Sequence, residues 1–168
     1  LLGDPPGLGK TLMSLAVAEK IKAQKVLIFT PSAVKWQFAG EIKRFLPEAT
    51  IVVVDGSVDK RRELWRSEAQ FYLANYELLL RDFEHINVRE WDLIIADEAT
   101  KISNPMAKQS KAVKKLQAKR KIAMTGTPIS NRANDLFNVL DFLNPGCCGN
   151  YFTFVDRYCV KNQWGGIF

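Results

Sequence analysis

The chain has 168 residues, 47% of them apolar and 25% charged, which indicates one globular domain with a single sizeable core. No apolar run approaches the ~18–20 residues of a membrane span, so we expect no integral membrane protein. Three cysteines, Cys147, Cys148 and Cys159, lack the spacing of metal ligands or of a disulfide framework, so we expect free thiols and an intracellular protein.

Short apolar runs alternate with amphipathic stretches along the whole chain. Runs without polar alternation are typical of strands that are buried on both faces of a parallel sheet. The predicted strands are residues 26–30, 51–54, 71–74, 93–96 and 122–125. The predicted helices are residues 10–23, 34–46, 57–67, 77–82, 106–116 and 131–143. This alternation predicts an α/β fold, a three-layer open and mainly parallel sheet with helices on both faces.

The ends of the chain suggest how the domain is bounded. Pro145 and Gly146 stop the last predicted helix, because proline cannot continue it. We therefore expect one domain over residues 1–146 and a tail over residues 147–168 that leads toward a further part of the protein. Leu1 and Leu2 run directly into a glycine-rich loop, so we expect them to end a strand that begins outside the chain.

Helical spacing also predicts which side chains are buried. In the first predicted helix, Leu12, Leu15 and Ala16 are expected to face inward. In the second, Trp36 is expected to join Phe38 in the core and not to serve as a surface platform on which a base could stack.

Residues 3–11, GDPPGLGKT, form the strongest motif. Glycine lets a loop turn tightly enough for its N–H groups to point at phosphate oxygens, and the following helix adds its positive end. We expect Gly7, Leu8 and Gly9 to cradle the phosphates. Lys10 would reach the β- and γ-phosphates as a catalytic residue, and the Thr11 hydroxyl would bind Mg²⁺.

This loop departs from the strict phosphate-loop pattern in one respect. Asp4 stands where the pattern has a glycine, and Pro5 and Pro6 lack N–H donors. These positions precede the N–H groups that are expected to bind the phosphates, so the departure removes few of the phosphate contacts. By itself, the segment could also be an ordinary glycine turn at the start of a helix.

An acidic pair ends the fourth predicted strand, in residues 91–100 (WDLIIADEAT). The carboxyl ends of such strands face the crevice where ligands bind. We assign Asp97 to ATP and Mg²⁺ and Glu98 to the orientation of the attacking water, as a catalytic residue. Taken alone, the pair could be a solvated turn, but Lys10 and Thr11 make a shared ATP–Mg²⁺ site the better interpretation.

A basic run follows the acidic pair. Residues 101–121 contain eight Lys or Arg residues and no Asp or Glu, against a net charge of +6 for the whole chain. Such a run suits a polyanion. Lys108, Lys111 and Lys115 also recur at helical spacing, so the run equally fits a solvated helix face.

A third motif ends the fifth predicted strand, in residues 122–128 (IAMTGTP). Hydroxyl groups there could connect the acidic site to a neighbouring loop, so we assign Thr125, Gly126 and Thr127 to coupling. Asn131 is expected to cap the next helix.

As a set, these motifs resemble helicase superfamily two, and most of all its chromatin-remodeller (Snf-type) branch of double-stranded DNA translocases. Residues 4–11 read DPPGLGKT where the branch typically has DEMGLGKT, and residues 30–32 (TPS) match its next motif. Residues 97–101 (DEATK) stand where the branch has DEAH and a basic residue. Residues 125–131 (TGTPISN) align with its TGTPLQN, and residues 140–143 (LDFL) resemble its downstream LxxFL with one residue fewer.

The resemblance implies a RecA-like ATP-binding lobe that couples ATP hydrolysis to movement on DNA. It further implies that Pro31, Ser32, Asn75, Tyr76 and Arg132 touch DNA phosphates, with little sequence preference and strong salt dependence. The family's second lobe, with its arginine finger, lies outside this chain. We therefore expect the chain alone to bind ATP–Mg²⁺ weakly and to hydrolyse ATP slowly at best.

Two departures from the family pattern concern coupling. Thr100 replaces the usual histidine, and Ser130 the usual glutamine. Coupling between ATP turnover and nucleic acid is therefore the property most open to change, and we include Thr100 among the coupling residues.

Two alternatives remain open at this point. The first is an AAA-type ATPase, whose loop commonly reads GPPGxGKT and matches from Pro5 onward. The strand after the acidic pair favours the helicase interpretation, because it ends in TGTP and not in a polar sensor. The second is a degenerate lobe that serves as a non-catalytic nucleotide-binding or DNA-binding scaffold. RNA in place of DNA also stays open.

Overall fold

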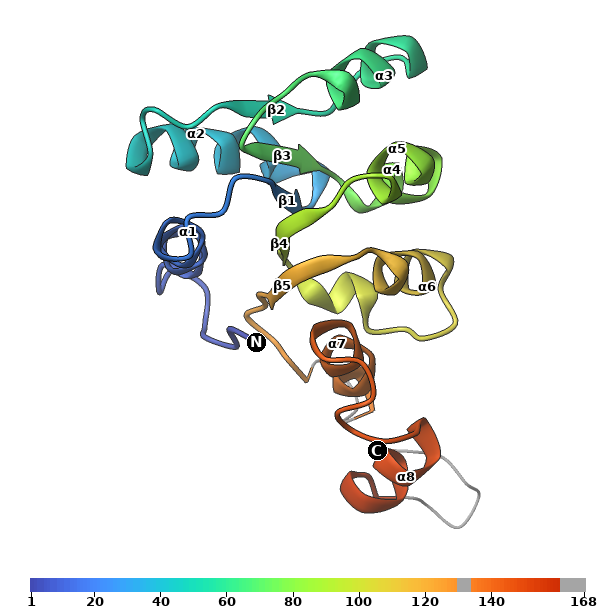
Figure 1. Cartoon of the computed structure of the whole chain (residues 1–168). Helices are drawn as coiled ribbons and strands as arrows, with labels where there is room; N and C mark the ends of the chain where they lie inside the picture. Colours follow the sequence, from blue (N-terminus) through green and yellow to red (C-terminus); the bar gives the residue numbers. More distant parts are fainter. Residues whose placement is uncertain (130–133, 161–168) are drawn as a thin grey trace.

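The computed structural model describes residues 1–129 and 134–160, and it shows a parallel sheet between two layers of helices (Figure 1). The five strands of this sheet are β1 (Val26–Phe29), β2 (Ile51–Val53), β3 (Phe71–Ala74), β4 (Trp91–Ala96) and β5 (Ala118–Ala123). They lie in the order β2-β3-β1-β4-β5, and all four pairings are parallel. The predicted α/β fold is confirmed.

The helices fall close to their predicted positions. They are α1 (Lys10–Lys20), α2 (Lys35–Phe45), α3 (Val58–Arg66), α4 (Tyr76–Arg81), α5 (Phe83–Asn87), α6 (Lys108–Lys115), α7 (Asp135–Leu143) and α8 (Tyr151–Tyr158). Two short 3₁₀ helices, η1 (Ser32–Val34) and η2 (Ala99–Ile102), follow β1 and β4.

Two apolar cores lie on opposite faces of the sheet. Successive strand residues point to opposite faces, so Val26 and Ile28 pack under α1 and α2, whereas Leu27 and Phe29 pack under the other helices. Figure 1 shows α1 and α2 on one side of the sheet and α3 to α6 on the other. Burial on both faces explains why the central strands β1, β3 and β4 carry almost no polar alternation.

The structure corrects several boundaries. β5 begins at Ala118, four residues before the predicted strand, and its first four residues read AKRK. The short helix α5 was not predicted, nor was α8, which falls in the predicted tail. Asn131, the predicted cap, lies outside the described residues, and the described part of α7 begins at Asp135.

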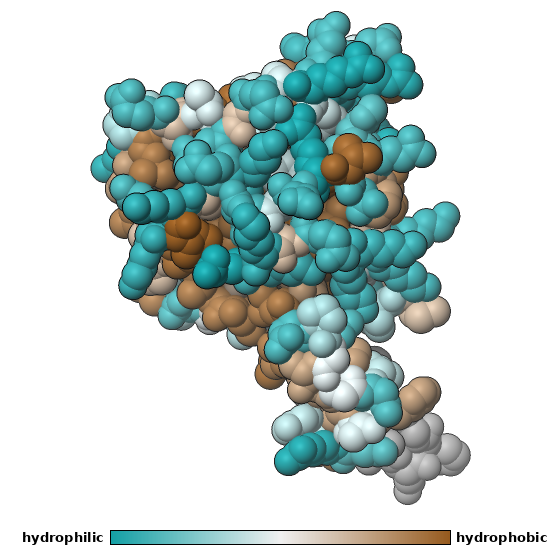
Figure 2. Space-filling view, viewed as in Figure 1, coloured by the Kyte–Doolittle hydropathy of each residue, from teal (hydrophilic) through white to brown (hydrophobic). Residues whose placement is uncertain are grey.

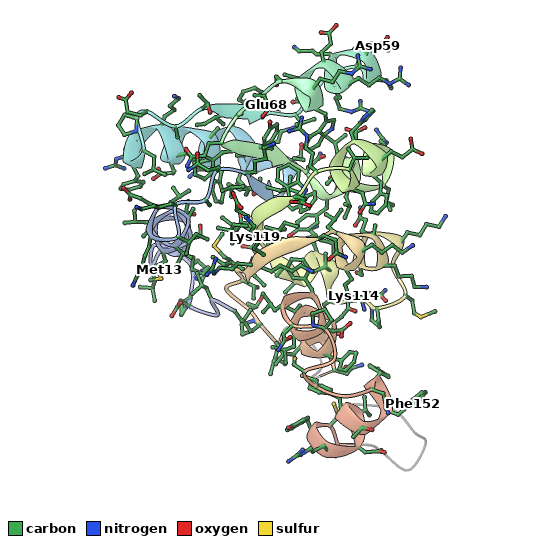
Figure 3. The ribbon with its side chains drawn as sticks, viewed as in Figure 1. Met13, Asp59, Glu68, Lys114, Lys119 and Phe152 are labelled. Carbon is green, nitrogen blue, oxygen red and sulfur yellow. The ribbon has the colours of Figure 1, made fainter. Side chains whose placement is uncertain are left out.

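Two burial predictions were wrong. On α1 only Leu15 of the predicted inward stripe is buried, together with Ser14 and Ala18, while Leu12 is exposed. Figure 2 shows hydrophobic residues gathered on the side of the molecule where α1 lies, and Figure 3 shows the side chain of Met13 on the outward side of this helix. Trp36, expected in the core, is 62% exposed on the first turn of α2.

The described C-terminal helices are joined by aromatic contacts. The ring of Phe137 on α7 lies 5.5 Å from that of Tyr151 and 5.3 Å from that of Phe154, both on α8. Lys114, on α6, forms an ion pair with Asp141 of α7 at 2.9 Å (Figure 3). These contacts fix α7 against α6 and α8 against α7.

Two other sequence predictions can be compared with the described residues. None of the helices described there combines the length and the apolar character needed to cross a membrane. Cys147, Cys148 and Cys159 are free thiols, as expected.

One buried ion pair joins α3 to the turn between α4 and α5, on the face of the sheet opposite α1 and α2. The carboxylate of Asp82, between α4 and α5, accepts hydrogen bonds from Arg61 Nε at 2.9 Å and from Trp65 Nε1 at 3.0 Å. The Arg61 and Asp82 side chains are 8% and 5% exposed. The hydrogen bond to Asp82 raises the pKa of Arg61, so the guanidinium stays charged inside the fold.

We predict that Asp82→Ala lowers the free energy of unfolding by about 3–5 kcal/mol, because it leaves a buried guanidinium without its counter-charge. Urea denaturation followed by far-UV circular dichroism measures this change. The matched control is Asp59→Ala. It breaks the exposed ion pair with Arg62 on α3, the helix that also carries Arg61, at a cost of about 1 kcal/mol or less. Equal losses in the two variants would contradict the structural role given to Asp82.

Candidate functional site

The carboxyl ends of the central strands meet at one edge of the sheet. The register places Phe29 beside both Ala74 and Ala96, and Ala96 beside Ala123. The residues that follow these strand ends therefore emerge side by side. This edge gathers the acidic pair, the third motif and the loop after β1, as the parallel fold requires.

The glycine-rich loop reaches the same edge from the start of the chain. Leu2 forms a parallel bridge with Met124, its N–H donates to Ala123 O at 2.8 Å, and its carbonyl accepts from Thr125 N at 3.0 Å. The loop then enters α1 at Lys10. Gly7 and Gly9 have φ angles of 85° and 77°, a left-handed conformation that glycine adopts without a steric penalty.

The ammonium group of Lys10 lies across this loop. Its Nζ donates to the carbonyl oxygens of Asp4 at 2.6 Å and of Pro5 at 3.1 Å. Gly9 precedes α1 without a side chain that could accept from the first-turn N–H groups. The loop, the helix end and Lys10 thus concentrate positive electrostatic potential in one place.

Asp97 is the most firmly held group of the site. Its N–H donates to Phe29 O at 2.8 Å, its carbonyl accepts from the Tyr76 hydroxyl at 2.7 Å, and its carboxylate Oδ2 accepts from Thr30 Oγ1 at 2.9 Å. Burial raises the pKa of Asp97, while the hydrogen bond from Thr30 and the charge of Lys10 act in the opposite direction. Asp97 and Lys10 are therefore electrostatic neighbours.

Glu98 follows in an unusual backbone conformation. Its φ and ψ angles are 50° and 55°, in the left-handed region, and its side chain is exposed. A residue with a Cβ pays about 1–2 kcal/mol for this conformation, and it persists where neighbouring contacts fix the chain. The turn separates the two carboxylates, leaving Asp97 half-buried and Glu98 in solvent.

A cavity of ≈ 260 Å³ opens between these groups. Its lining includes Thr11 at the start of α1, Pro31 after β1, and both Asp97 and Glu98. Gln37 and Glu41 on α2 also line this cavity. Residues that lie more than eighty positions apart in the sequence thus face one cavity.

The third motif packs against the glycine-rich loop. Thr125 is buried, and its Oγ1 accepts from Thr127 N at 3.1 Å, which closes a tight turn. A Cβ placed on Gly126 would approach Pro6 Cδ to 3.0 Å. A main-chain bond from Ala99 N to Met124 O at 2.8 Å joins the strand before this motif to the acidic segment.

Thr100, the remaining residue assigned to coupling, lies in η2 immediately after the acidic pair. Its side chain is half-buried, and its carbonyl accepts from Ser103 N at 3.2 Å. It therefore lies within the segment that connects the acidic pair to the rest of the chain.

The residues assigned to DNA contact differ in their exposure to solvent. Pro31 is half-buried, Ser32 is exposed at the start of η1, and Asn75 caps α4 by accepting from Leu78 N at 3.3 Å. All three follow the carboxyl ends of strands, at the edge of the sheet that also carries the acidic pair. Arg132 lies outside the described residues.

Tyr76 requires a correction. Its side chain is 2% exposed, and its hydroxyl donates to Asp97 O, so it does not face solvent where a phosphate could meet it. Burial raises the pKa of Tyr76 well above its usual value, which keeps the hydroxyl protonated as a donor. The family resemblance had placed Tyr76 at a strand end in contact with DNA, and only the tertiary fold turns its side chain inward.

Sequence reasoning also missed Thr30. It belongs to the TPS motif, but its role is the hydrogen bond to Asp97. One signal was available in the sequence. Thr30 is a hydroxyl residue at the end of a predicted buried strand, and that strand could lie beside the strand that precedes Asp97.

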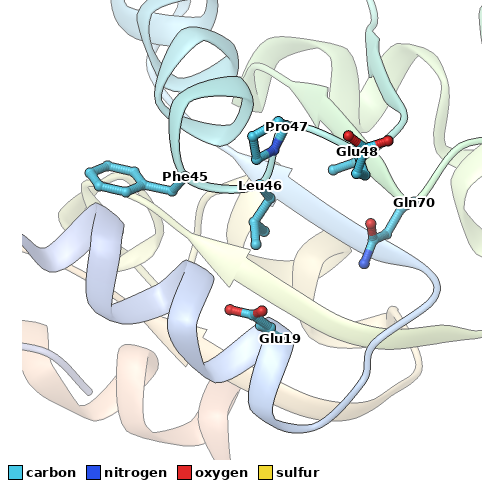
Figure 4. A pocket seen from close by; sticks show the side chains of 7 residues that line it. Glu19, Phe45, Leu46, Pro47, Glu48 and Gln70 are labelled. Carbon is cyan, nitrogen blue, oxygen red and sulfur yellow. The ribbon is translucent and has the colours of Figure 1, made fainter.

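A second hollow, of ≈ 360 Å³, lies at the opposite edge of the sheet (Figure 4). Glu19 at the end of α1, residues 45–49 after α2, and Gln70 before β3 line it. Among the motif residues that the structure describes, none lines this hollow, so the edge at the carboxyl ends of the strands is the better candidate for chemistry despite its smaller cavity.

Comparison with known proteins agrees with this geometry. The family model of the SNF2-related domain matches residues 1–163. The chain belongs to this family. The AAA-type alternative is therefore wrong, and the suspected Snf-type resemblance is confirmed.

Curated relatives of this SNF2-related chain are much longer proteins. The chain is 33% identical over 167 residues to the putative ATP-dependent helicase/translocase YwqA of Bacillus subtilis, covering 95% of this chain and 18% of the relative. It is 30% identical over 171 residues to the human DNA repair and recombination protein RAD54B, covering 94% of this chain and 19% of the relative. The chain thus spans less than a fifth of these relatives.

Solved structures of the family share the fold. The SWI2/SNF2 ATPase core of Sulfolobus solfataricus in complex with double-stranded DNA is 37% identical, with a TM-score of 0.84, over 94% of this chain and 34% of that one. The same core domain in a second structure is 36% identical, with a TM-score of 0.76, over 94% of this chain and 33% of that one.

For this SNF2-related lobe we predict that Gly126→Ala displaces the glycine-rich loop, because the added methyl group would meet the rigid ring of Pro6. In ¹H–¹⁵N correlation spectra, the amide signals of Gly7 and Gly9 should shift. Gly40→Ala is the matched control, since no atom lies within 4 Å of a Cβ at that exposed helical position. Unshifted loop amides in Gly126→Ala would contradict the contact.

Proposed function

We propose that this chain is the ATP-binding lobe of a DNA-dependent ATPase that couples ATP hydrolysis to movement on double-stranded DNA. The observation that carries the proposal is the meeting of Thr11, Asp97 and Glu98 around one ≈ 260 Å³ cavity, with Lys10 close enough to influence the pKa of Asp97. Membership of the SNF2-related family supports it. An intracellular location is part of the same proposal.

The phosphate end of ATP would lie on the glycine-rich loop. N–H groups of Gly7, Leu8 and Gly9 and the first turn of α1 would bind phosphate oxygens. Lys10 would exchange its two carbonyl partners for the β- and γ-phosphates, a stronger charge-assisted pairing.

The oxygen donors at the cavity fit Mg²⁺. Thr11 offers a hydroxyl and Asp97 a carboxylate whose orientation is set by Thr30, and hard oxygen ligands of this kind suit the ion. Bound there with the nucleotide, the ion would supply positive charge to the phosphate oxygens as negative charge develops.

Glu98 would position the attacking water. Its backbone turn carries the carboxylate away from Asp97 and into solvent beside the cavity. A carboxylate placed in this way can accept a proton from water in line with the terminal phosphate.

A further group of positive charge is needed for fast hydrolysis. Among the described residues, those that line the cavity include no arginine. We therefore infer that a second RecA-like lobe supplies an arginine finger, a group worth ~10³–10⁵ in rate. The chain alone would bind ATP–Mg²⁺ and hydrolyse it slowly.

DNA would cross the same edge of the sheet. Pro31, Ser32 and Asn75 follow β1 and β3 there, and Ser32 is exposed. Hydroxyl and N–H contacts to phosphates fix position without reading bases, so we expect little sequence preference. The related core of Sulfolobus solfataricus was solved with double-stranded DNA, which supports a duplex as the partner.

We predict that Lys10→Ala lowers the affinity for a non-hydrolysable ATP analogue with Mg²⁺ by about 30-fold or more, since a charge-assisted contact to phosphate is worth about 2 kcal/mol. Isothermal titration calorimetry of wild-type and variant chains measures the change. Lys20→Ala, on the exposed last turn of the same helix, should bind as the wild type does. Equal binding by Lys10→Ala and wild type, or no binding by either, would favour the scaffold alternative.

We predict that affinity for a 20-base-pair duplex falls steeply between 50 and 200 mM salt and is equal for unrelated sequences, because phosphate contacts release counterions. Fluorescence anisotropy measures both properties. Ser32→Glu should weaken binding several-fold by placing a negative charge beside the phosphates, and Ser67→Glu, at the amino end of β3, should not. A flat salt response would overturn the electrostatic part, and tighter binding of duplex RNA would replace DNA as the partner.

A further inference from the structure

Tyr76 connects the start of α4 to the acidic pair after β4. It is the first residue of α4 and follows Asn75, the residue proposed above to meet DNA. Its ring is buried and stacks on that of Phe29 of β1, with centroids 5.6 Å apart and planes inclined by 25°. From this fixed ring its hydroxyl reaches Asp97 O at 2.7 Å.

The bond from Tyr76 acts on the peptide that joins the two carboxylate residues. Asp97 is already held on its other side, where its N–H donates to Phe29 O at 2.8 Å. The next residue, Glu98, has the left-handed φ of 50°. Holding the Asp97 carbonyl therefore holds the orientation of the peptide from which Glu98 turns outward.

Asn75 and Tyr76 are adjacent but bond in different directions. Asn75 Oδ1 accepts from Leu78 N and so sets the first turn of α4. Tyr76 leaves the same turn toward the acidic pair. A shift of this turn when Asn75 meets a partner would displace the hydroxyl that fixes Asp97.

We propose that Tyr76 is a positioning residue that carries contact with DNA at Asn75 to the peptide between Asp97 and Glu98. The inference rests on the proposed function and adds to it the route by which DNA alters the nucleotide site. Tyr76 touches neither partner directly and acts through Asp97.

The same strand offers a matched control. Tyr72 of β3 is also buried, and its hydroxyl donates to Ser67 O at 2.7 Å, but at the amino end of the strand. This hydroxyl also accepts from Ala69 N at 3.0 Å and from Arg89 Nη1 at 2.9 Å, so its removal breaks more bonds than the removal of the Tyr76 hydroxyl. Replacing either tyrosine by phenylalanine keeps the ring and removes one hydroxyl bonded to a main-chain oxygen. Both variants should fold, so a difference between them in binding reports the position of the bond and not its loss.

The test compares Tyr76→Phe and Tyr72→Phe with the wild type in titrations of a non-hydrolysable ATP analogue, with and without Mg²⁺ and a 20-base-pair duplex. Tyr76→Phe should raise the Mg²⁺ concentration needed for half-maximal nucleotide binding about five- to ten-fold and leave Mg²⁺-free binding unchanged. It should also abolish the change in nucleotide affinity that the duplex produces in the wild type. Tyr72→Phe should keep both properties.

Each result decides one point. Wild-type values in Tyr76→Phe, or the same losses in Tyr72→Phe, would overturn the inference while the proposed function stands. Thr30→Val serves as a reference for a weakened Asp97, and it should raise the Mg²⁺ requirement but keep the effect of DNA. Nucleotide binding that does not depend on Lys10 in the wild type would overturn the proposed function together with the inference.

Discussion

The parallel register of the central strands is the constraint on which the site depends. β1 lies between β3 and β4, and all three end at the same level, with Phe29 beside both Ala74 and Ala96. A slip of one residue in any pairing would turn every side chain of that strand to the other face and withdraw the residue that follows it from the edge. The two cores, one on each face, oppose such a slip because every strand residue of β1 is buried.

At this edge the main chain serves as the scaffold for the charged groups. Hydrogen bonds hold the N–H and the carbonyl of Asp97, and Thr30 Oγ1 and the Glu98 N–H donate to its carboxylate, so its burial is matched by fixed partners. Burial raises its pKa, and the hydroxyl of Thr30 limits that rise. Glu98, one residue later, is exposed because its left-handed backbone reverses the chain. One turn thus produces two carboxylates in different environments, which suits two different tasks.

The sequence was sufficient for those features that depend on local pattern, and insufficient where tertiary contacts decide. Apolar runs predicted all five strands, and the composition signal is clearest in β1, β3 and β4, which are buried on both faces. The start of β5 was missed because Lys119, Arg120 and Lys121 carry no such signal, although this segment pairs with β4 and Lys119 forms an ion pair with Asp92 of that strand. Spacing and residue type were enough to predict that Lys10 and Asp97 lie near each other. In contrast, Tyr76 was expected at the surface and is buried, and Trp36 was expected in the core and is exposed. Helical spacing predicts which residues share one face of a helix. Apolar residues occur on nearly all sides of α1, however, so only its contacts in the fold determine which face is buried.

The replacement at Thr100 can be judged from the way the edge is connected. The acidic segment is tied to the third motif through the main chain, because Ala99 N donates to Met124 O at 2.8 Å. Thr125 N in turn donates to Leu2 O at 3.0 Å, immediately before the glycine-rich loop. Neither bond uses a side chain, so neither is lost when threonine stands in place of histidine. The contact of Gly126 with Pro6 likewise depends on the absence of a side chain. The three motifs therefore remain in mechanical contact in this chain, and the effect of Thr100 is confined to what its own side chain can reach.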